Sequence, residues 1–148
     1  MGCDIHAYIE ESDKTYNTCF GEVYLGRDYK LFALMADVRN SGDYVPVSDL
    51  KGLPQGLSWE VQHKLSTVDG KEVDKQYIKK YENTDIDVLT DYHGFSWLSL
   101  KELKKVQKAY SKTDKNDFYN SKRSSNLDAI VAAMEQLKKP RLVFWFDC

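Results

Sequence analysis

The sequence lacks a long hydrophobic run and shows no secretory signal. No stretch approaches the roughly 18 consecutive apolar residues that a membrane-spanning helix needs. Near the N-terminus, the polar side chains of Asp4, His6, Glu10 and Glu11 lie where a signal peptide is apolar. These absences predict a cytoplasmic protein that does not bind membranes.

Cysteine is scarce, with only Cys3, Cys19 and Cys148 in 148 residues. Their number is odd and none belongs to a C-x-x-C pair, so a secreted disulfide framework is not expected. We predict free thiols. On a strand, Cys3 and His6 would point to opposite faces, which argues against joint zinc ligation despite their C-x-x-H spacing.

Neither sign of charge dominates. The net charge is −2, which does not favour general nucleic-acid binding. Residues 1–100 carry 10 basic and 17 acidic side chains, whereas residues 101–148 carry 11 and 6. The basic region either faces an anionic ligand or consists of solvated helix faces.

The familiar nucleotide-binding and hydrolase motifs are also missing. The sequence contains no G-x-x-x-x-G-K-[ST], G-x-G-x-x-G, H-E-x-x-H or G-x-S-x-G. The paired H-x-[ST] motif of two-histidine phosphoesterases is absent, because Ala7-Tyr8 follow His6 and Gly94-Phe95 follow His93. The sequence therefore identifies neither a cofactor nor a metal.

The hydrophobic pattern predicts an α+β (mixed α/β) fold with one domain over residues 1–148. Apolar and polar residues alternate over 3–12, and a second β-prone run covers 18–25, so the chain opens with a hairpin. Residues 141–146, RLVFWF, are apolar on both faces and predict a central strand. We expect three to five helices to cover the sheet that contains these strands.

Several helix signals follow the hairpin. Asp28 is placed to cap a helix over 29–38, Ser58 to start a short helix, and Ser99 with Glu102 to form a capping box. A helix with an apolar stripe from Leu127 to Leu137 ends at Pro140. Residues 39–57 and 111–125 are predicted connections, and a weak pattern over 67–90 hints at a helical face. The predicted core includes Ile5, Leu34, Ile130, Val131, Val143 and Phe144.

The pattern Asp-x-His occurs twice, at Asp4-Ile5-His6 and at Asp91-Tyr92-His93. On a strand, residues two apart share a face, so each pair offers a carboxylate beside an imidazole. If the two segments converge, they supply enough groups for a metal site or for general acid and base catalysis. The alternative is two independent histidines, either exposed or hydrogen-bonded.

Arginines and carboxylates flank the first predicted helix. Arg27 directly precedes the N-terminus of this helix, where free N–H groups and the helix dipole favour an anion. The alternative is a surface arginine paired with a local acid. Asp37 and Arg39 lie at the far end of the same helix, and Asp147 follows the last strand, at the kind of position where α/β proteins place functional groups.

Several segments together resemble a family of small proteins common in phage and prophage genomes. They are MGCDIH at 1–6, GRDYKLFALMADVRN at 26–40, GLP at 52–54, HGFSWLSLKEL at 93–103 and RLVFWFD at 141–147. Members of that family usually end in Asn where this chain has Cys148. The resemblance implies an accessory phage protein acting in the host cytosol. The resemblance also suggests which positions group together: Cys3, Asp4, His6, Arg27, Asp37, Arg39, His93, Ser96 and Asp147.

By analogy with small phage proteins of similar size, we expect a counter-defence role through binding of a small anionic, nucleotide-derived ligand. If the protein is a hydrolase, it cleaves a phosphoester or glycosidic bond. His6 or His93 then acts as general acid or base, Asp4 orients a histidine and Arg27 holds phosphate. Arg39, Asp37, Ser96 and Asp147 complete the predicted site. The alternatives are a sponge that sequesters the ligand intact and a protein-interaction module, and a homo-oligomer is left open.

Overall fold

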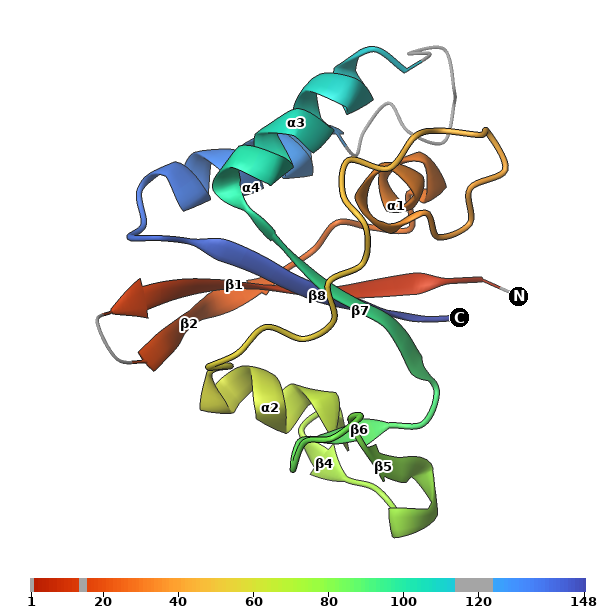
Figure 1. The fold of residues 1–148 in the computed structure, drawn as a ribbon, viewed down its shortest axis with the longest axis vertical. Coiled ribbons are helices and arrows are strands. Elements are labelled where there is room, and N and C mark those ends of the chain that lie inside the picture. The colour runs from red at the N-terminus through yellow and green to blue at the C-terminus, as the bar shows by residue number, and fades with distance from the viewer. Residues whose placement is uncertain (1, 14–15, 114–123) are drawn as a thin grey trace.

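A four-stranded antiparallel sheet forms the centre of the computed structural model, which describes residues 2–13, 16–113 and 124–148. The strand order is β2 (Tyr16–Val23), β1 (Asp4–Asp13), β8 (Arg141–Asp147) and β7 (Tyr92–Ser99). Figure 1 shows the N- and C-termini close together at one end of this sheet. The predicted α+β class is confirmed, and the predicted hairpin and C-terminal strand lie in the same sheet.

The two inner strands, β1 and β8, are buried on both faces. Along β8, Leu142, Phe144 and Phe146 point to one face, whereas Val143 and Trp145 point to the other, and all five are at most 1% exposed. The chain RLVFWF therefore fills two hydrophobic cores at once, which explains why it has no polar face.

Within the part of the chain that the structure describes, three helices cover one face of the sheet. They are α1 (Tyr29–Ala36), α3 (Leu100–Ser111) and α4 (Ser124–Glu135), drawn above the sheet in Figure 1. Their apolar side chains pack on alternate residues of β1 and β8. Of the predicted core, Leu34, Ile130, Val131, Val143 and Phe144 are buried, and Ile5 is partly buried near the start of β1.

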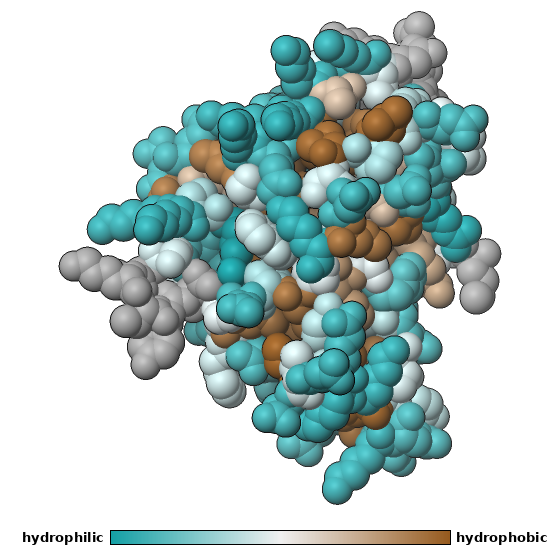
Figure 2. Space-filling model, viewed as in Figure 1, coloured by the Kyte–Doolittle hydropathy of each residue, from teal (hydrophilic) through white to brown (hydrophobic). Residues whose placement is uncertain are grey.

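A small unit of residues 59–89, here called the lower module, covers the opposite face (Figure 1). It contains α2 (Trp59–Leu65), a β3–β4 hairpin (Thr67–Val68 and Lys71–Glu72), a 3₁₀ turn η1 (Lys75–Tyr77) and a β5–β6 hairpin (Ile78–Lys80 and Asp87–Leu89). Val61, Leu65 and Val88 are fully buried in the core that also contains Val143 and Trp145. On the face shown in Figure 2, hydrophilic residues cover much of this module.

The local helix signals are confirmed. Asp28 and Ser58 cap α1 and α2, and the Ser99–Glu102 capping box opens α3. The helix predicted over 29–38 ends at Ala36, because Asp37 adopts a left-handed conformation and its N–H bonds back to the last turn.

One other predicted region differs from the structure. The helical face suggested over 67–90 is wrong, since short hairpins occupy that segment. The connection predicted over 111–125 lies mostly outside the described residues. Within the described ranges, no helix is long and apolar enough to cross a membrane.

Candidate functional site

One end of the sheet gathers polar side chains from three strands on the face that carries the lower module. Asp4 pairs with Asp147 across β1 and β8, and Tyr92 pairs with Asp147 across β7 and β8. His6 pairs with Trp145, and their rings stack with centroids 5.8 Å apart. This arrangement brings the predicted site residues Asp4, His6 and Asp147 together.

His6 is packed largely as an aromatic residue. Its ring centroid lies 5.1 Å from that of Tyr92, and its Nε2 lies 3.9 Å from Oδ2 of Asp147. His6 Nε2 and Trp145 Nε1 are buried and have no hydrogen-bond partner among the described residues. Burial, with the Asp147 charge as a smaller cause, raises the pKa of the Tyr92 hydroxyl, so Tyr92 stays protonated at neutral pH.

Arg27 is engaged by Asp4. Its Nε donates to Asp4 Oδ1 at 2.9 Å and a terminal nitrogen donates to Oδ2 at 3.0 Å. This hydrogen bonding lowers the pKa of Asp4, although partial burial opposes the shift. At the N-terminus of α1, the Asp28 carboxylate already accepts the Leu31 N–H. The geometry therefore matches the alternative reading of Arg27 as an arginine paired with a local acid.

His93 lies on the opposite face of the sheet from His6. His93 pairs with Phe146 and His6 pairs with Trp145, and consecutive residues of β8 point to opposite faces. The structure thus corrects the expectation that the two histidines form one site. Asp91 also precedes β7, which begins at Tyr92, so the second Asp-x-His pair does not share a strand face.

The remaining predicted ligand-binding residues are dispersed. Asp37 accepts a hydrogen bond from the Asn40 amide at 2.7 Å, at the C-terminal end of α1. The Arg39 guanidinium lies over the Tyr29 ring, 5.8 Å from its centroid. Ser96 is buried, and its hydroxyl accepts the Lys51 N–H at 3.0 Å. The contacts found for Asp37 and Ser96 are within the protein and account for their positions.

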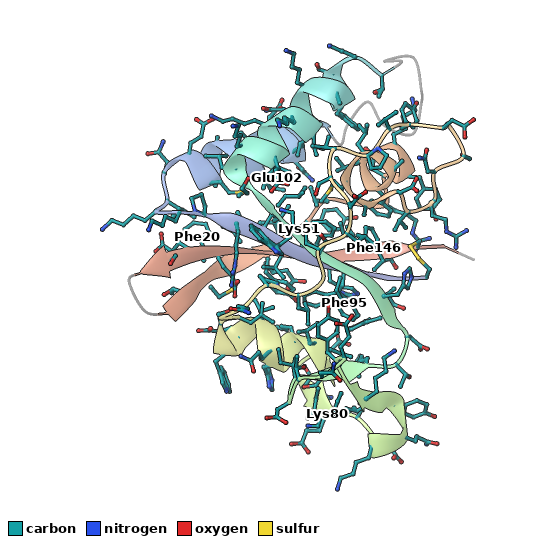
Figure 3. All side chains as sticks on the ribbon, viewed as in Figure 1. Phe20, Lys51, Lys80, Phe95, Glu102 and Phe146 are labelled. Carbon is teal, nitrogen blue, oxygen red and sulfur yellow. A yellow bond between two sulfur atoms is a disulfide. The ribbon has the colours of Figure 1, made fainter. Side chains whose placement is uncertain are left out.

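The expectation of three free thiols is wrong for two of them. Cys3 and Cys148 form a disulfide, whereas Cys19 is free. The β1–β8 register, which pairs Asp4 with Asp147, brings the two cysteines side by side. The Cα atoms of Cys3 and Cys148 are 4.0 Å apart. Figure 3 shows the sulfur–sulfur bond at the end of the sheet beyond Phe146.

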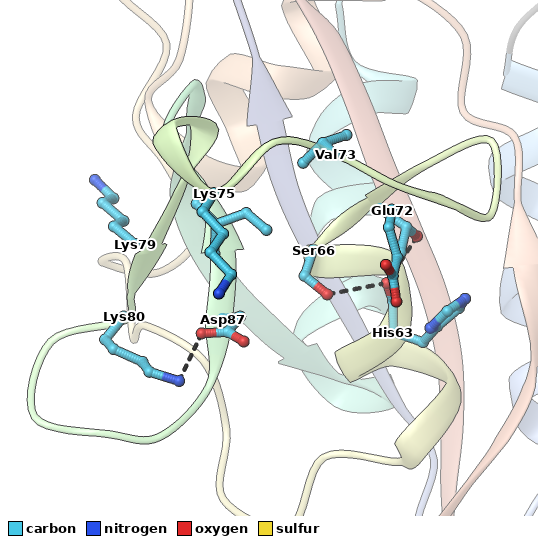
Figure 4. A pocket seen from close by; sticks show the side chains of 10 residues that line it. His63, Ser66, Glu72, Val73, Lys75, Lys79, Lys80 and Asp87 are labelled. Atoms are coloured by element: carbon cyan, nitrogen blue, oxygen red, sulfur yellow. Dashed lines mark hydrogen bonds and ion pairs between the residues drawn. The ribbon is translucent and has the colours of Figure 1, made fainter.

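A cavity of about 540 Å³ in the lower module was not predicted from the sequence. Figure 4 shows side chains around this cavity, among them Lys75, Lys80 and Asp87 on one side and Ser66 and Glu72 on the other. Its lining residues are His63, Ser66, Thr67, Glu72, Val73, Lys75, Ile78, Lys79, Lys80 and Asp87.

Three lysines and two carboxylates line this cavity. Lys80 Nζ lies 2.7 Å from Asp87 Oδ1, and this hydrogen bond raises the pKa of Lys80. Lys75 and Lys79 form no ion pair among the described residues, and Glu72 is the other carboxylate of the lining. The cavity therefore keeps an excess of positive charge.

An exposed aromatic residue stacks on His63, which lines the cavity. Trp59 is 73% exposed, and its ring stacks on the ring of His63, with centroids 5.4 Å apart and planes 11° from parallel. Trp59 and His63 are four residues apart on α2, a spacing that places side chains on one helix face. This spacing is the sequence signal for the pair, but it does not reveal that His63 shares a cavity with three lysines.

No family model matches the chain, and no curated protein or solved structure shows significant similarity to it.

Proposed function

We propose that the cavity of the lower module binds a small phosphorylated, nucleotide-like ligand and holds it without turnover. The supporting observation is a cavity lined by Lys75, Lys79 and Lys80 beside the Trp59–His63 stack. Lysine is a common phosphate-binding side chain. Aromatic rings stack on nucleobases with little dependence on sequence. The proposal keeps the predicted ligand class and moves its site away from Arg27.

The size of the cavity suits such a ligand. Small-molecule sites enclose about 300–1,000 Å³, and this cavity measures about 540 Å³. The hydroxyls of Ser66 and Thr67 already donate to the His63 carbonyl oxygen, so each keeps its acceptor capacity toward the cavity. Lys75 and Lys79 then supply the charge that an anionic ligand needs.

Binding without hydrolysis is favoured because neither predicted catalytic histidine, His6 or His93, lines the cavity, and His63, which does, stacks on Trp59. The hydrolase hypothesis places His6 and His93 in one site, whereas they lie on opposite faces of the sheet. Both belong to the central sheet rather than to the residues that line the cavity. If the chain is a phage accessory protein, as the sequence resemblance implies, its function is then to sequester a nucleotide-derived signal.

Calorimetric titration with AMP, ATP, ADP-ribose and a cyclic dinucleotide tests this proposal. We expect one of these probes to bind, and mass spectrometry after denaturation to recover it intact. Lys75→Glu should weaken binding at least about tenfold, because the substitution replaces a favourable charge with a repulsive one. Trp59→Ala should lower the affinity for the nucleotide but leave the affinity for inorganic pyrophosphate unchanged.

The matched control is Lys105→Glu, which makes the same charge change at an exposed position of α3 on the other side of the sheet. It should retain wild-type affinity. Equal losses for Lys75→Glu and Lys105→Glu would mean that only overall charge matters, and would contradict a site in the cavity. Recovery of a cleaved probe would contradict sequestration.

A further inference from the structure

We propose that Cys3, His93 and Cys148 bind a zinc ion when the Cys3–Cys148 disulfide is reduced. One ligand atom from each residue lies within 4.8 Å of the other two. The three residues come from the start of the chain, β7 and the end of the chain, and they converge on the helix-covered face of the sheet. The zinc site is separate from the cavity of the lower module, which lies on the other face.

The sheet register produces this convergence. Cys3 precedes β1 and Cys148 follows β8, one step beyond the Asp4–Asp147 pair. His93 pairs with Phe146, two residues before Cys148, and therefore points to the same face as Cys148 in an extended chain. The His93 ring centroid lies 6.2 Å from that of Phe146, whose buried side chain forms the apolar base of the cluster.

Two local features hold the ligands in place. The Cys3 N–H donates to the Tyr29 hydroxyl at 3.0 Å, which ties the buried cysteine to α1. The β7 strand has an irregular register between His93 and Ser96, and Gly94 within it has a φ of 66°. This irregularity begins directly after His93, whose own pairing with Phe146 keeps the regular register.

The donor set suits zinc. Thiolate and imidazole are the ligands of structural and catalytic zinc sites, with Zn–S near 2.3 Å and Zn–N near 2.0–2.1 Å. For tetrahedral angles these lengths require ligand atoms about 3.5–3.8 Å apart. A His93 nitrogen already lies within 4.8 Å of both sulfurs, which separate when the disulfide is reduced. Because His93 and Cys148 are exposed, water can take the fourth position.

Zinc binding and the disulfide exclude each other. Two molecules of a low-molecular-weight thiol reduce the Cys3–Cys148 bond by transferring two electrons and two protons, and they are themselves oxidised to a disulfide. Zinc then displaces the protons of both thiols and binds a neutral nitrogen of His93. Reoxidation by a disulfide of the same class reverses these steps and releases the ion.

Cobalt substitution gives a direct readout. The full chain is reduced with a phosphine, freed from the reductant and titrated with Co²⁺ while the absorption spectrum is recorded. We expect one equivalent to bind with a thiolate-to-cobalt charge-transfer band and strong visible bands of tetrahedral geometry, and Zn²⁺ to bleach them. The oxidised chain should show none of these bands.

Single variants assign the ligands. Cys148→Ser should reduce the charge-transfer intensity by about half and weaken binding, while His93→Ala should weaken Co²⁺ binding at least about tenfold and keep the charge-transfer band. Cys19→Ser is the matched control and should behave as wild type, since Cys19 is the free cysteine. Cys148 is exposed, so this test does not depend on replacing the buried Cys3.

Two results would overturn the site. The first is a reduced wild-type chain that binds no Co²⁺. The second is a spectrum and affinity that Cys148→Ser and His93→Ala leave unchanged, because the thiolate and imidazole would then come from elsewhere.

Discussion

Arg141 and the fully buried Glu10 form an ion pair that joins the sheet to the segment before α2. Arg141 Nε donates to Glu10 Oε1 at 2.9 Å, and Glu10 Oε2 accepts the Ser58 N–H at 2.7 Å. The same guanidinium also donates to the carbonyl oxygens of Gln55 and Gly56. One charged pair therefore fixes the position at which the chain enters the lower module.

Breaking this pair should strongly destabilise the protein. Glu10→Ala leaves the Arg141 guanidinium, only 14% exposed, without its carboxylate. Removing one partner of a buried ion pair costs about 3–5 kcal/mol of unfolding free energy, measurable by urea denaturation. Glu72→Ala, at an exposed position of β4, should change the unfolding free energy by less than about 0.5 kcal/mol. A similar small loss for Glu10→Ala would show that Glu10 is not paired as described.

Tyr110 links α3 to the start of α1. Its hydroxyl donates to Asp28 Oδ2 at 2.5 Å, while Asp28 Oδ1 accepts the Leu31 N–H and so caps α1. Tyr110→Phe removes only this hydroxyl from a buried site. Hydrogen bonds to charged groups contribute about 1.5–3 kcal/mol, so we expect a loss of that size in thermal or urea unfolding. Tyr77→Phe, at a half-exposed position in the lower module, should leave stability unchanged.

The Asp4–Arg27 ion pair should make the free energy of unfolding depend on pH in the acid range. The hydrogen bond from Arg27 holds the pKa of Asp4 below its ordinary value of 3.8 in the folded protein. The folded state therefore binds fewer protons than the unfolded state near that pH. The contribution of the pair is present above pH 3.8 and is lost as the pH falls through the folded-state pKa.

Comparing wild type with Asp4→Asn tests the sign of this effect. The two side chains are about half exposed, so solvent and salt screen the pair and its contribution is small. We expect wild type to be slightly more stable than Asp4→Asn at pH 7, and this difference to disappear well below pH 3.8. A difference that stays constant with pH would show that Asp4 acts through shape rather than charge.

The sequence predicts those parts of the fold that depend on short stretches of chain. The alternation of Ile5, Ala7 and Ile9 defines β1, and the caps at Asp28, Ser58 and Ser99 define three helix starts, because each signal acts within a few residues. The lower module is different. Its strand β6 is held by the packing of Val88 and Leu89 in the core that contains Trp145, which no local pattern reveals.

The candidate sites depend on register, and register is a long-range property. The sequence predicts that residues 3–10 and 141–146 are central strands, but not that they are antiparallel neighbours. That single fact brings Cys3 beside Cys148, which are 145 positions apart. The Asp-x-His pattern correctly places Asp4 and His6 on one face, yet it carries no information about the face of β7 that bears His93.

Substitutions of Gly94 test whether the packing of β7 against Phe146 fixes the position of His93. The φ of 66° at Gly94 is unfavourable for any residue with a Cβ, and a Cβ built there would lie 2.8 Å from Cδ2 of the fully buried Phe146. Gly94→Ala should therefore incur a backbone cost of about 1–2 kcal/mol and a packing cost of about 1–3 kcal/mol. Urea denaturation measures the sum of the two costs.

Two other glycines separate these costs. Gly70 has a φ of 75° with no atom within 4 Å of its added Cβ, so Gly70→Ala should show the backbone cost alone. Gly21 has an open environment and no such φ, so Gly21→Ala should be neutral or slightly stabilising. We expect the loss of stability to increase in the order Gly21, Gly70, Gly94. Equal losses at Gly70 and Gly94 would mean that the Phe146 ring moves aside freely, and that the close approach of β7 to Phe146 does not constrain the position of His93.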